Sequence, residues 1–395
     1  MLGQKNAKKI KVLMVTGLFL PEINGAVLQC KNLMNSMVNE VEFKVLTGSV
    51  SRVRIQESWG HGIEISRIGA GDSGVFFKSL FMGLFLIKFA LLVRGIEIVH
   101  VHGFSVRNAL LVLVARLMRK RIVLKMTSFG QDDPISVQRQ SKLQWMVYRL
   151  VDDYIAVSPS FVTAARTAGI EPSRCHLIPN AVDIEKFCSA SVSDRKSIRR
   201  SLGFGDDEKV FLFIGHFSPE KRPMMIYDAW RALVAEGYNC RLTLIGKTSG
   251  GYEIDSNLAP QMNSDANLRG LSGKLTIIEF TEAISDFMKA ADVFVHPSVR
   301  EGLPNVVLEA MASSLPCIVT RLPGVTDSLI RDGETGLLIE KDDLNALSDR
   351  LKLLLTDREL GRRLGRNARA LVMASYGIQE VSNATRRVYF TSTDR

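Results

Sequence analysis

Short apolar strands alternate with helices along this chain, and the alternation constrains the fold more than any other feature. Runs such as 10–15 (IKVLMV) and 210–214 (VFLFI) are continuously apolar, as in strands that are covered on both faces. Segments with helical spacing follow, for example 26–38 and 224–235. Strand–helix alternation of this kind predicts doubly wound, mostly parallel sheets with helices on both faces.

The alternation is interrupted once and then restarts. Residues 186–208 are polar and charged, and they predict an interdomain connection with a short helix. We therefore predict two Rossmann-like α/β domains that face each other across a cleft, residues 1–190 and residues 191–375. The predicted strands are 10–15, 43–46, 63–68, 96–101, 122–126, 154–157, 210–214, 241–245, 274–278, 293–296, 317–320 and 337–340. The predicted helices are 26–38, 75–94, 106–118, 142–150, 159–168, 224–235, 284–290, 305–313, 342–371 and 376–390.

The charge of the chain is unevenly distributed. Residues 1–190 hold 24 Lys and Arg against 14 Asp and Glu, whereas residues 191–395 hold 27 of each kind. The whole net charge of +10 therefore belongs to the first part and indicates an anionic partner there: a membrane surface, a phosphorylated acceptor or nucleic acid. No nucleic-acid-binding motif is present, so we expect no nucleic-acid partner.

Residues 75–93, VFFKSLFMGLFLIKFALLV, form the most apolar segment. They carry Lys78 and Lys88, which disfavours a helix that spans a membrane. Two alternatives stay open: a helix packed on the sheet, or an amphipathic helix that lies on a bilayer. They are compatible if one face of the helix packs on the sheet and the other contacts the bilayer. Residues 5–20 do not match a signal peptide, and five scattered cysteines fit a reducing compartment. We expect a cytoplasmic protein, peripheral on the inner face of the membrane if the second alternative holds.

The stretch 297–312, PSVREGLPNVVLEAMA, is the strongest candidate for a binding site. It joins an apolar strand to a helix, with Glu301 in the loop, Pro304 at the first helical position and Glu309 inside the helix. Backbone N–H groups at Gly302, Leu303 and Asn305 would face the same opening. Such a unit binds phosphate on its N–H groups, while the carboxylates accept hydrogen bonds from sugar or ribose hydroxyls. A paired-carboxylate hydrolase is the less favoured interpretation, because both Glu residues belong to one loop–helix unit.

A second strand–loop–helix unit contains GHFSPEKRP, residues 215–223. Gly215, His216 and Lys221 lie in this loop, where N–H groups and the lysine ammonium suit a phosphate. Alone, the loop would indicate an ordinary surface turn. Beside the two-carboxylate unit it predicts the other half of an anion site. In the first domain, Gly25 ends the loop after the first strand, where a glycine permits close approach of the backbone to a ligand.

Histidine and acidic residues elsewhere predict no metal site. His100 and His102 share one face of a strand, but no third ligand follows them. We expect His100 to be a core residue and His102, at the carboxyl end of the strand, to reach the cleft. Asp132 and Asp133 predict a solvated turn before Pro134. A Walker lysine motif and a triplet of the DxD type are both missing, so we expect neither ATP hydrolysis nor a metal.

These motifs resemble the retaining nucleotide-sugar glycosyltransferases of GT-B architecture, the glycosyl transferases group 1 family. The Glu-x7-Glu signature of that family is matched by Glu301 and Glu309, and its Pro-Asn-Gly-Val-Asp hinge is similar to residues 179–183, PNAVD. The phosphate loop of the family resembles GHFSPEKRP, and residues 324–340 match its usual later run. The resemblance covers nearly the whole chain and is strongest between residues 174 and 340.

The resemblance implies a role for each matching residue. Lys221 would neutralise the leaving nucleotide diphosphate, Glu301 would hold sugar hydroxyls, and Glu309 would bind the ribose. Gly302 and Leu303 would add backbone contacts, and Gly25 would approach the diphosphate or acceptor. Members of the family retain anomeric configuration and need no metal. Their C-terminal helix, here 376–395, packs back on the first domain.

The chain departs from the family at two positions. His216 stands where the phosphate loop usually has arginine, and Phe129 stands where many relatives have a histidine facing the cleft. We consider His102 as a replacement for that histidine. The predicted catalytic residues are Glu301, Lys221 and His102. The predicted donor-binding residues are Gly25, Gly215, His216, Lys221, Glu301, Gly302, Leu303, Asn305 and Glu309.

The resulting prediction is a hexosyltransferase that moves a sugar from a nucleotide-diphosphate donor to a hydroxyl of a glycan or lipid-linked saccharide. No cofactor besides the donor substrate is expected, and the product would belong to cell-surface polysaccharide or glycolipid synthesis. Two alternatives stay open. One is a sugar-nucleotide epimerase, for which His102, His216 and Asp132 are the spare acid–base candidates. The other is a glycosyltransferase-like protein that binds without catalysis.

Overall fold

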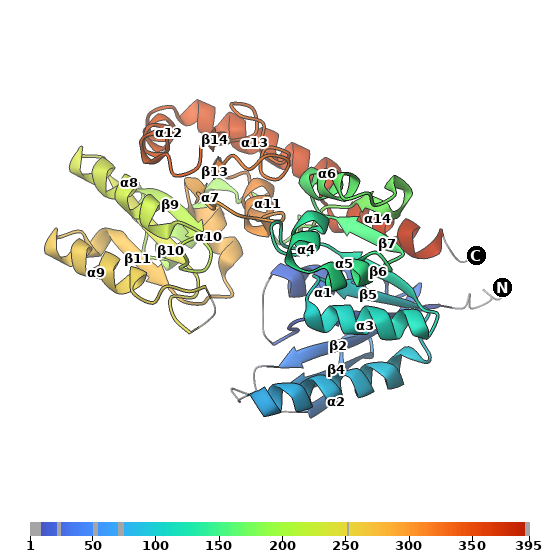
Figure 1. Cartoon of the computed structure of the whole chain (residues 1–395). Helices are drawn as coiled ribbons and strands as arrows, with labels where there is room; N and C mark the ends of the chain where they lie inside the picture. The colour runs from blue at the N-terminus through green and yellow to red at the C-terminus, as the bar shows by residue number, and fades with distance from the viewer. Residues whose placement is uncertain (1–8, 22–24, 50–53, 70–74, 251–252, 392–395) are drawn as a thin grey trace. The chain divides into compact units, whose positions relative to one another are not determined.

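The computed structural model describes residues 9–21, 25–49, 54–69, 75–250 and 253–391. The chain divides into two compact units, which are described separately (Figure 1). The first comprises Met1–Ala181 and Ile378–Arg395, and the second comprises Val182–Gly377. The chain therefore passes between units after Ala181, within the PNAVD motif, whereas the sequence analysis placed the domain boundary at residue 190.

The first unit is built on an eight-stranded sheet with the order β3-β4-β2-β1-β5-β6-β7-β8. All neighbouring strands pair in parallel except β3, which runs antiparallel to β4 at the edge. Strands β5 and β7 are buried at every residue, which explains their continuous apolar runs. The strands are β1 Ile10–Thr16, β2 Val41–Ser49, β3 Arg54–Trp59, β4 Ile63–Gly69, β5 Ile98–His102, β6 Arg121–Lys125, β7 Asp153–Ala156 and β8 Cys175–Leu177.

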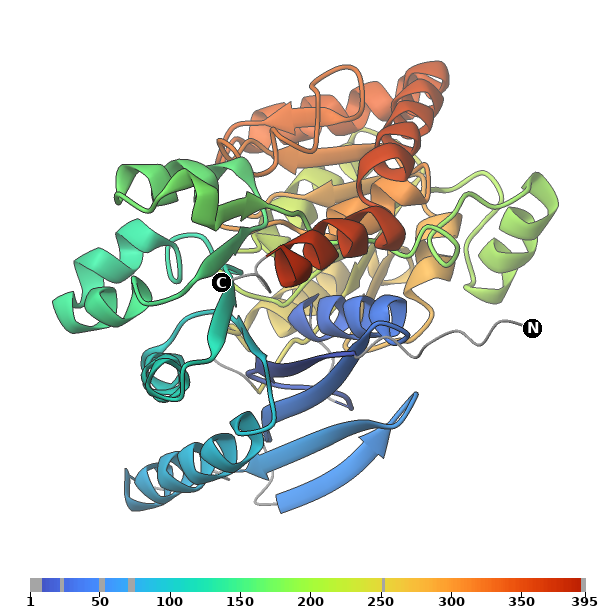
Figure 2. The same ribbon diagram turned by 90° about the vertical axis from the view of Figure 1, so that its right-hand side faces the viewer.

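Helices cover both faces of this sheet. Helices α1 (Gly25–Met37) and α14 (Ile378–Phe390) lie side by side on one face, and α2 to α5 lie on the other (Figures 1 and 2). The C-terminal helix is fixed to the first unit by Tyr389, whose hydroxyl lies 2.5 Å from Nδ1 of His100. The remaining helices of this unit are α2 Val75–Val93, α3 Val106–Leu117, α4 Pro134–Gln140, α5 Lys142–Tyr148 and α6 Pro159–Thr167.

The second unit has a six-stranded parallel sheet with the order β11-β10-β9-β12-β13-β14. Successive strands extend from β9 in one direction and from β12 in the other, so the order reverses between these two neighbours. The strands are β9 Lys209–Ile214, β10 Cys240–Ile245, β11 Leu275–Ile278, β12 Val293–His296, β13 Cys317–Thr320 and β14 Leu337–Ile339. The helices are α7 Val192–Ser201, α8 Pro223–Ala235, α9 Leu258–Leu268, α10 Ile284–Ala290, α11 Asn305–Ala312, α12 Leu344–Thr356 and α13 Arg358–Ser375.

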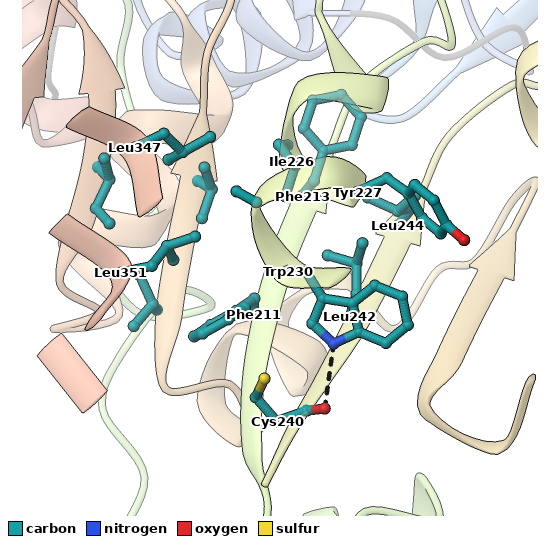
Figure 3. Packing of buried hydrophobic residues seen from close by; sticks show 14 of the residues in the cluster. Phe211, Phe213, Ile226, Tyr227, Trp230, Cys240, Leu242, Leu244, Leu347 and Leu351 are labelled. Carbon is teal, nitrogen blue, oxygen red and sulfur yellow. Dashed lines mark hydrogen bonds between the residues drawn. The ribbon is translucent and has the colours of Figure 1, made fainter. Parts of the chain in front are cut away.

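Trp230 anchors the core of the second unit. It lies on α8, is fully buried, and donates its indole N–H to the carbonyl oxygen of Cys240 at 3.1 Å (Figure 3). Phe211 and Phe213 of β9 belong to the same cluster, with Leu351 of α12. This packing fixes α8 on the sheet and with it the loop that leads from β9 into α8.

The structure confirms the predicted strand–helix alternation and corrects several elements. Residues 342–371, predicted as one helix, form α12 and α13, because the carboxylate of Asp357 accepts the N–H of Leu360 and starts a new helix. Pro304 is the N-cap residue of α11 rather than its first helical residue. Helices α4 and α9 and the two edge strands of the first sheet, β3 and β8, were not predicted.

We expect Trp230→Ala to lower the free energy of unfolding of the second unit by about 3–5 kcal/mol, because it removes a large buried side chain and leaves a cavity. Trp230→Phe keeps most of the packing but leaves the Cys240 carbonyl without its donor, a loss of about 1–3 kcal/mol. Urea unfolding measures both changes. Leu268→Ala is the control, because this side chain is 86% exposed and we expect a change within about 0.5 kcal/mol. Equal effects of all three substitutions would contradict this account of the core.

Candidate functional site

Three side chains meet where the sheet of the second unit reverses its strand order. The Nζ atom of Lys221, in the loop after β9, lies 2.5 Å from Oε1 of Glu301 in the loop after β12. The Nε2 atom of His296, the last residue of β12, lies 2.7 Å from the same oxygen. Because β9 and β12 are parallel neighbours, their carboxyl ends open at one edge, where α/β sheets bind ligands. We call these three residues the Lys221–Glu301–His296 cluster.

The cluster keeps Glu301 ionised. Burial alone would raise the pKa of Glu301, but the charge of Lys221 and the hydrogen bond from His296 outweigh it and hold the pKa far below its usual range. His296 is 1% exposed, its ring is stacked on Phe294, and its Nδ1 atom has no hydrogen-bond partner within the described ranges. A carboxylate that stays charged suits the acceptance of hydrogen bonds rather than proton transfer near neutral pH.

Further contacts hold the two loops together. The backbone N–H of Val299 donates to the carbonyl oxygen of Glu220 at 2.9 Å. The guanidinium of Arg300 lies 2.6 Å from a carboxylate oxygen of Glu220 and 3.3 Å from one of Glu253. Lys221 uses one of its three ammonium protons on Glu301, which leaves donors for an anion in the same place.

Close backbone packing shapes the start of the β9–α8 loop. Gly246 has a φ of +151°, and a Cβ atom there would lie 2.0 Å from the carbonyl oxygen of Gly215. A Cβ at Gly215 would in turn lie 2.9 Å from the ring of Phe213. His216 is exposed in this loop, and partial burial together with the charges of Lys221 and Lys247 lowers its pKa. His216 is therefore mostly neutral at pH 7.

Glu309 lies on α11, the helix that follows the loop of Glu301. Its side chain is mostly buried and makes no hydrogen bond or ion pair with the described residues. Burial raises its pKa to about 7, and the charge of Lys186 only partly offsets this. Gly302 and Leu303 are buried in the preceding loop, and Asn305 is the first residue of α11. The structure thus brings these predicted residues onto one loop–helix unit.

The predicted residues of the first unit have a different setting. Gly25 is the first residue of α1, and residues 22–24 of its loop lie outside the described residues. Phe129 packs edge-on against Phe161, with ring centroids 5.4 Å apart. His102, expected to reach a cleft, is only 7% exposed, because α1 covers it and both ring nitrogens lie 3.4 Å from Sγ of Cys30. Burial and the neighbouring His100 and Lys125 hold the pKa of His102 well below its usual value.

The structure corrects the expected role of Asp132 and Asp133. Both are buried rather than solvated, at 3% and 2% exposure. Asp132 accepts hydrogen bonds from the N–H groups of Thr127 and Ser128 and from the Thr127 hydroxyl. Asp133 accepts the N–H of Ser136 and caps α4. The pair therefore organises the loop after β6.

Sequence reasoning missed His296. Its signal was present, since it ends the strand that precedes Glu301, but a lone histidine in an apolar strand usually indicates a core residue. Only the fold of the loop brings Glu301 back to this ring. Within the described ranges, no three His, Cys, Asp or Glu side chains gather as a metal site. Nor does any described helix have the length and apolar character needed to cross a membrane.

We expect Glu309→Gln to stabilise the ligand-free protein at pH 8. A carboxyl whose pKa rises on folding from 4.5 to about 7 destabilises the fold where it is ionised, above pH 7. Removing that charge should add about 1–2 kcal/mol to the free energy of unfolding at pH 8, discounted for partial exposure. The gain should shrink as the pH falls from 7 to 4.5, because the native carboxyl then binds a proton. Urea unfolding at pH 8 and pH 5 checks this, and a gain that is equal at both pH values would refute it.

Two family models match consecutive parts of the chain. Residues 194–371 match the model described as Glycosyl transferases group 1, and residues 23–186 match Glycosyltransferase Family 4. The first match contains the Lys221–Glu301–His296 cluster and Glu309. The second ends close to the passage between the two units.

Two curated relatives match the chain over about half of their own length. An Escherichia coli UDP-Gal:alpha-D-GlcNAc-diphosphoundecaprenol alpha-1,3-galactosyltransferase is 30% identical over 53% of this chain and 52% of that protein. The capsular polysaccharide biosynthesis glycosyltransferase CapM of Staphylococcus aureus is 27% identical over 54% of this chain and 53% of that protein.

Solved structures match the whole fold. Anabaena HepE, solved with UDP and glucose, has a TM-score of 0.77 and 17% identity, over 97% of this chain and all of that one. Sucrose-phosphate synthase of Thermosynechococcus elongatus has a TM-score of 0.79 and 19% identity, over 97% and 99%. The predicted fold class is thereby confirmed: the chain has the GT-B fold of two α/β units with parallel sheets, and the two glycosyltransferase models match it over consecutive parts.

Proposed function

We propose that this protein is a glycosyltransferase that moves a sugar from a nucleoside diphosphate to a hydroxyl of a glycan or lipid-linked saccharide. The observation that carries the proposal is the Lys221–Glu301–His296 cluster at the strand-order reversal of the second sheet. The carboxylate of Glu309 lies on the helix that follows, without a hydrogen-bond partner in the described part of the chain. The matched family models and the nucleotide-bound HepE structure support a nucleotide-sugar donor.

Lys221 is assigned to the diphosphate. Its ammonium stands at the carboxyl end of β9, where two of its three protons are left for an anion. When the bond to the sugar breaks, negative charge grows on the leaving diphosphate, and a fixed ammonium stabilises that charge. Glu301 holds the ammonium in place before the donor binds.

Glu301 is assigned to the hydroxyls of the transferred sugar. Its pKa is too low for a general acid or base near neutral pH, so it acts as an acceptor of hydrogen bonds. His296 orients the carboxylate through its hydrogen bond to Oε1. The ring of His296 is itself held in place because it is buried at the end of β12. Gly302 and Leu303 are positioned in the same loop to add backbone contacts.

Glu309 is assigned to the ribose. A mostly buried carboxylate with no partner among the described residues is unfavourable, and ribose hydroxyls would supply the missing hydrogen-bond donors. Donation to the charged form would return its pKa toward the ordinary value. The raised pKa of the empty site is therefore explained by the missing ligand and does not require a role as a catalytic base.

Retention of anomeric configuration, independence of metal and the lack of a further cofactor are parts of the same proposal. The name of the Escherichia coli relative describes a diphosphoundecaprenol-linked acceptor, which supports a lipid-linked saccharide here. We accordingly place the protein in cell-surface polysaccharide or glycolipid synthesis, at the cytoplasmic face of the membrane. An epimerase is less favoured, because Asp132 is occupied by three donors and His102 is covered by α1.

Calorimetric titration with UDP, GDP, ADP and dTDP tests nucleotide binding. We expect one of them to bind, and we expect Lys221→Ala to weaken that binding roughly 10- to 100-fold, the value of a charge-assisted hydrogen bond. Lys196→Ala, on exposed α7, is the matched control and should bind like the unmodified protein. Nucleotide binding that survives unchanged in Lys221→Ala would refute the assignment.

Release of nucleoside diphosphate from the matching sugar nucleotide tests the reaction itself. We expect release to require an acceptor and to continue in EDTA, because the ammonium of Lys221 supplies the positive charge. Turnover of the donor without an acceptor would indicate the epimerase instead, and binding without any turnover over a panel of lipid-linked saccharides would indicate a binding protein. Loss of turnover in EDTA would refute metal independence alone.

A further inference from the structure

One face of the first unit exposes an unusual number of large apolar side chains. They lie on α2, α3 and α5, and we call this surface the α2–α3–α5 face. Its members are Ile87 at 61% exposure, Leu91 at 55%, Val106 at 63%, Leu110 at 37%, Leu113 at 36%, Leu117 at 82%, Leu143 at 71% and Met146 at 66%. They make up half of the large hydrophobic residues that are exposed in the described part of the chain.

These side chains form a continuous surface. On α3, the sequence positions 106, 110, 113 and 117 follow helical spacing and line one stripe. Helix α3 contacts α2 on one side and α5 on the other, so the stripes of the three helices adjoin. Figures 1 and 2 show the three helices as one layer over the same face of the sheet.

The outward residues are not needed for the core. On α2, Phe85, Phe89 and Val93 are fully buried against the sheet, whereas Ile87 and Leu91 point away from it. Helix α2 is therefore apolar on both sides. Its buried side packs on the sheet, and its outward side is free to contact a bilayer, so the two alternatives that the sequence left open are compatible. An exposed apolar surface of this extent marks an interaction site.

The helices of the face carry charged residues of one sign only, and the acidic neighbour Asp152 is paired with Arg116 of α3. Helices α2, α3, α4 and α5 contain no acidic residue. Arg119, Arg139 and Lys142 border the face, are exposed and make no ion pair with the described residues. Such a surface fits a partner that is both apolar and anionic, which is the chemistry of a bilayer containing acidic phospholipids.

A second copy of the chain fits the face less well. In a symmetric dimer the same patch meets itself, so the basic residues would face one another without acidic partners. We propose that the α2–α3–α5 face docks on an anionic bilayer, with the apolar stripes at the level of the acyl boundary and the basic border at the headgroups. The inference deepens the proposed function, since it names the surface that brings the protein to a lipid-linked acceptor.

Trp145 gives a direct reporter of docking. It lies on α5 between Leu143 and Met146 and is partly exposed, whereas Trp230 is buried in the core of the second unit. The third tryptophan, Trp59, is also partly exposed, but it lies on edge strand β3 and is not a member of the α2–α3–α5 face. Lipids brominated on their acyl chains should quench the fluorescence of Trp145 when the full-length protein is added to vesicles with 30% phosphatidylglycerol. The same lipids in pure phosphatidylcholine vesicles should quench little. Trp145→Phe should abolish the quenching without affecting binding.

Sedimentation with the same vesicles measures affinity. The double variant Leu117→Asn/Leu143→Asn should bind at least about tenfold more weakly, because two large apolar groups no longer enter the bilayer. The double variant Arg139→Gln/Lys142→Gln should lose about fivefold per charge, and binding of the unmodified protein should weaken at 0.5 M salt. Leu268→Asn, which removes an 86% exposed leucine from α9, and Arg362→Gln/Arg363→Gln on α13 are matched controls and should bind normally.

Three results would overturn the proposal: equal binding to neutral and anionic vesicles, equal losses in the control variants, or a dimer in solution that Leu117→Asn/Leu143→Asn dissociates. All substitutions except Trp145→Phe are at exposed positions, and unchanged thermal unfolding would confirm that the variants fold. Nucleotide binding by calorimetry in the same samples separates this test from the proposed function. Vesicle binding without nucleotide binding would refute the function alone, and the reverse would refute the docking face alone.

Discussion

The geometry of the second unit depends on two neighbouring parallel strands, from which the sheet is extended toward opposite edges. Strands β9 and β12 are neighbours, and the chain leaves both at the same edge. Their loops must therefore meet, and the bond between Lys221 and Glu301 is the point at which they do. Burial removes water from both charged groups, and this desolvation is unfavourable. Each group compensates for the other's loss of water by serving as its hydrogen-bond partner. The same bond leaves a fixed positive charge at the opening.

The two glutamates of one short loop–helix unit have opposite electrostatic surroundings. Glu301 has a cation and a histidine as partners and stays ionised, whereas Glu309 has no partner among the residues that the structure describes and has a raised pKa. The carboxylate of Glu301 has its hydrogen-bond partners before any ligand binds, whereas that of Glu309 lacks them in the described part of the chain. A ligand that brings hydroxyl donors to Glu309 and an anion to Lys221 would satisfy both, and a nucleoside diphosphate carries both groups. This contrast favours a binding role for Glu309 over proton transfer.

The sequence predicted the strand–helix alternation and the loop–helix units because their signals are local. Apolar runs, glycines and Pro304 affect the backbone over only a few residues, so each could be recognised in the amino-acid sequence. The errors had equally local causes. Asp357 and Asp133 cap new helices through single hydrogen bonds, and an aspartate in a polar stretch does not reveal which N–H it will accept. The boundary near Ala181 likewise depended on packing, since Gln29 binds both backbone groups of that residue.

The sequence by itself determined the architecture and the identity of Lys221, Glu301 and Glu309 as candidate site residues, because hydrophobic periodicity and motif spacing are properties of neighbouring residues. Only the tertiary structure decided that Lys221 binds Glu301, that His296 supports it, and that His102 lies beneath α1. These are contacts between segments far apart in the chain or turned back on themselves by a loop. The burial that raises the pKa of Glu309 and the exposure of the α2–α3–α5 face depend on every element packed nearby, so they cannot be determined from any one segment.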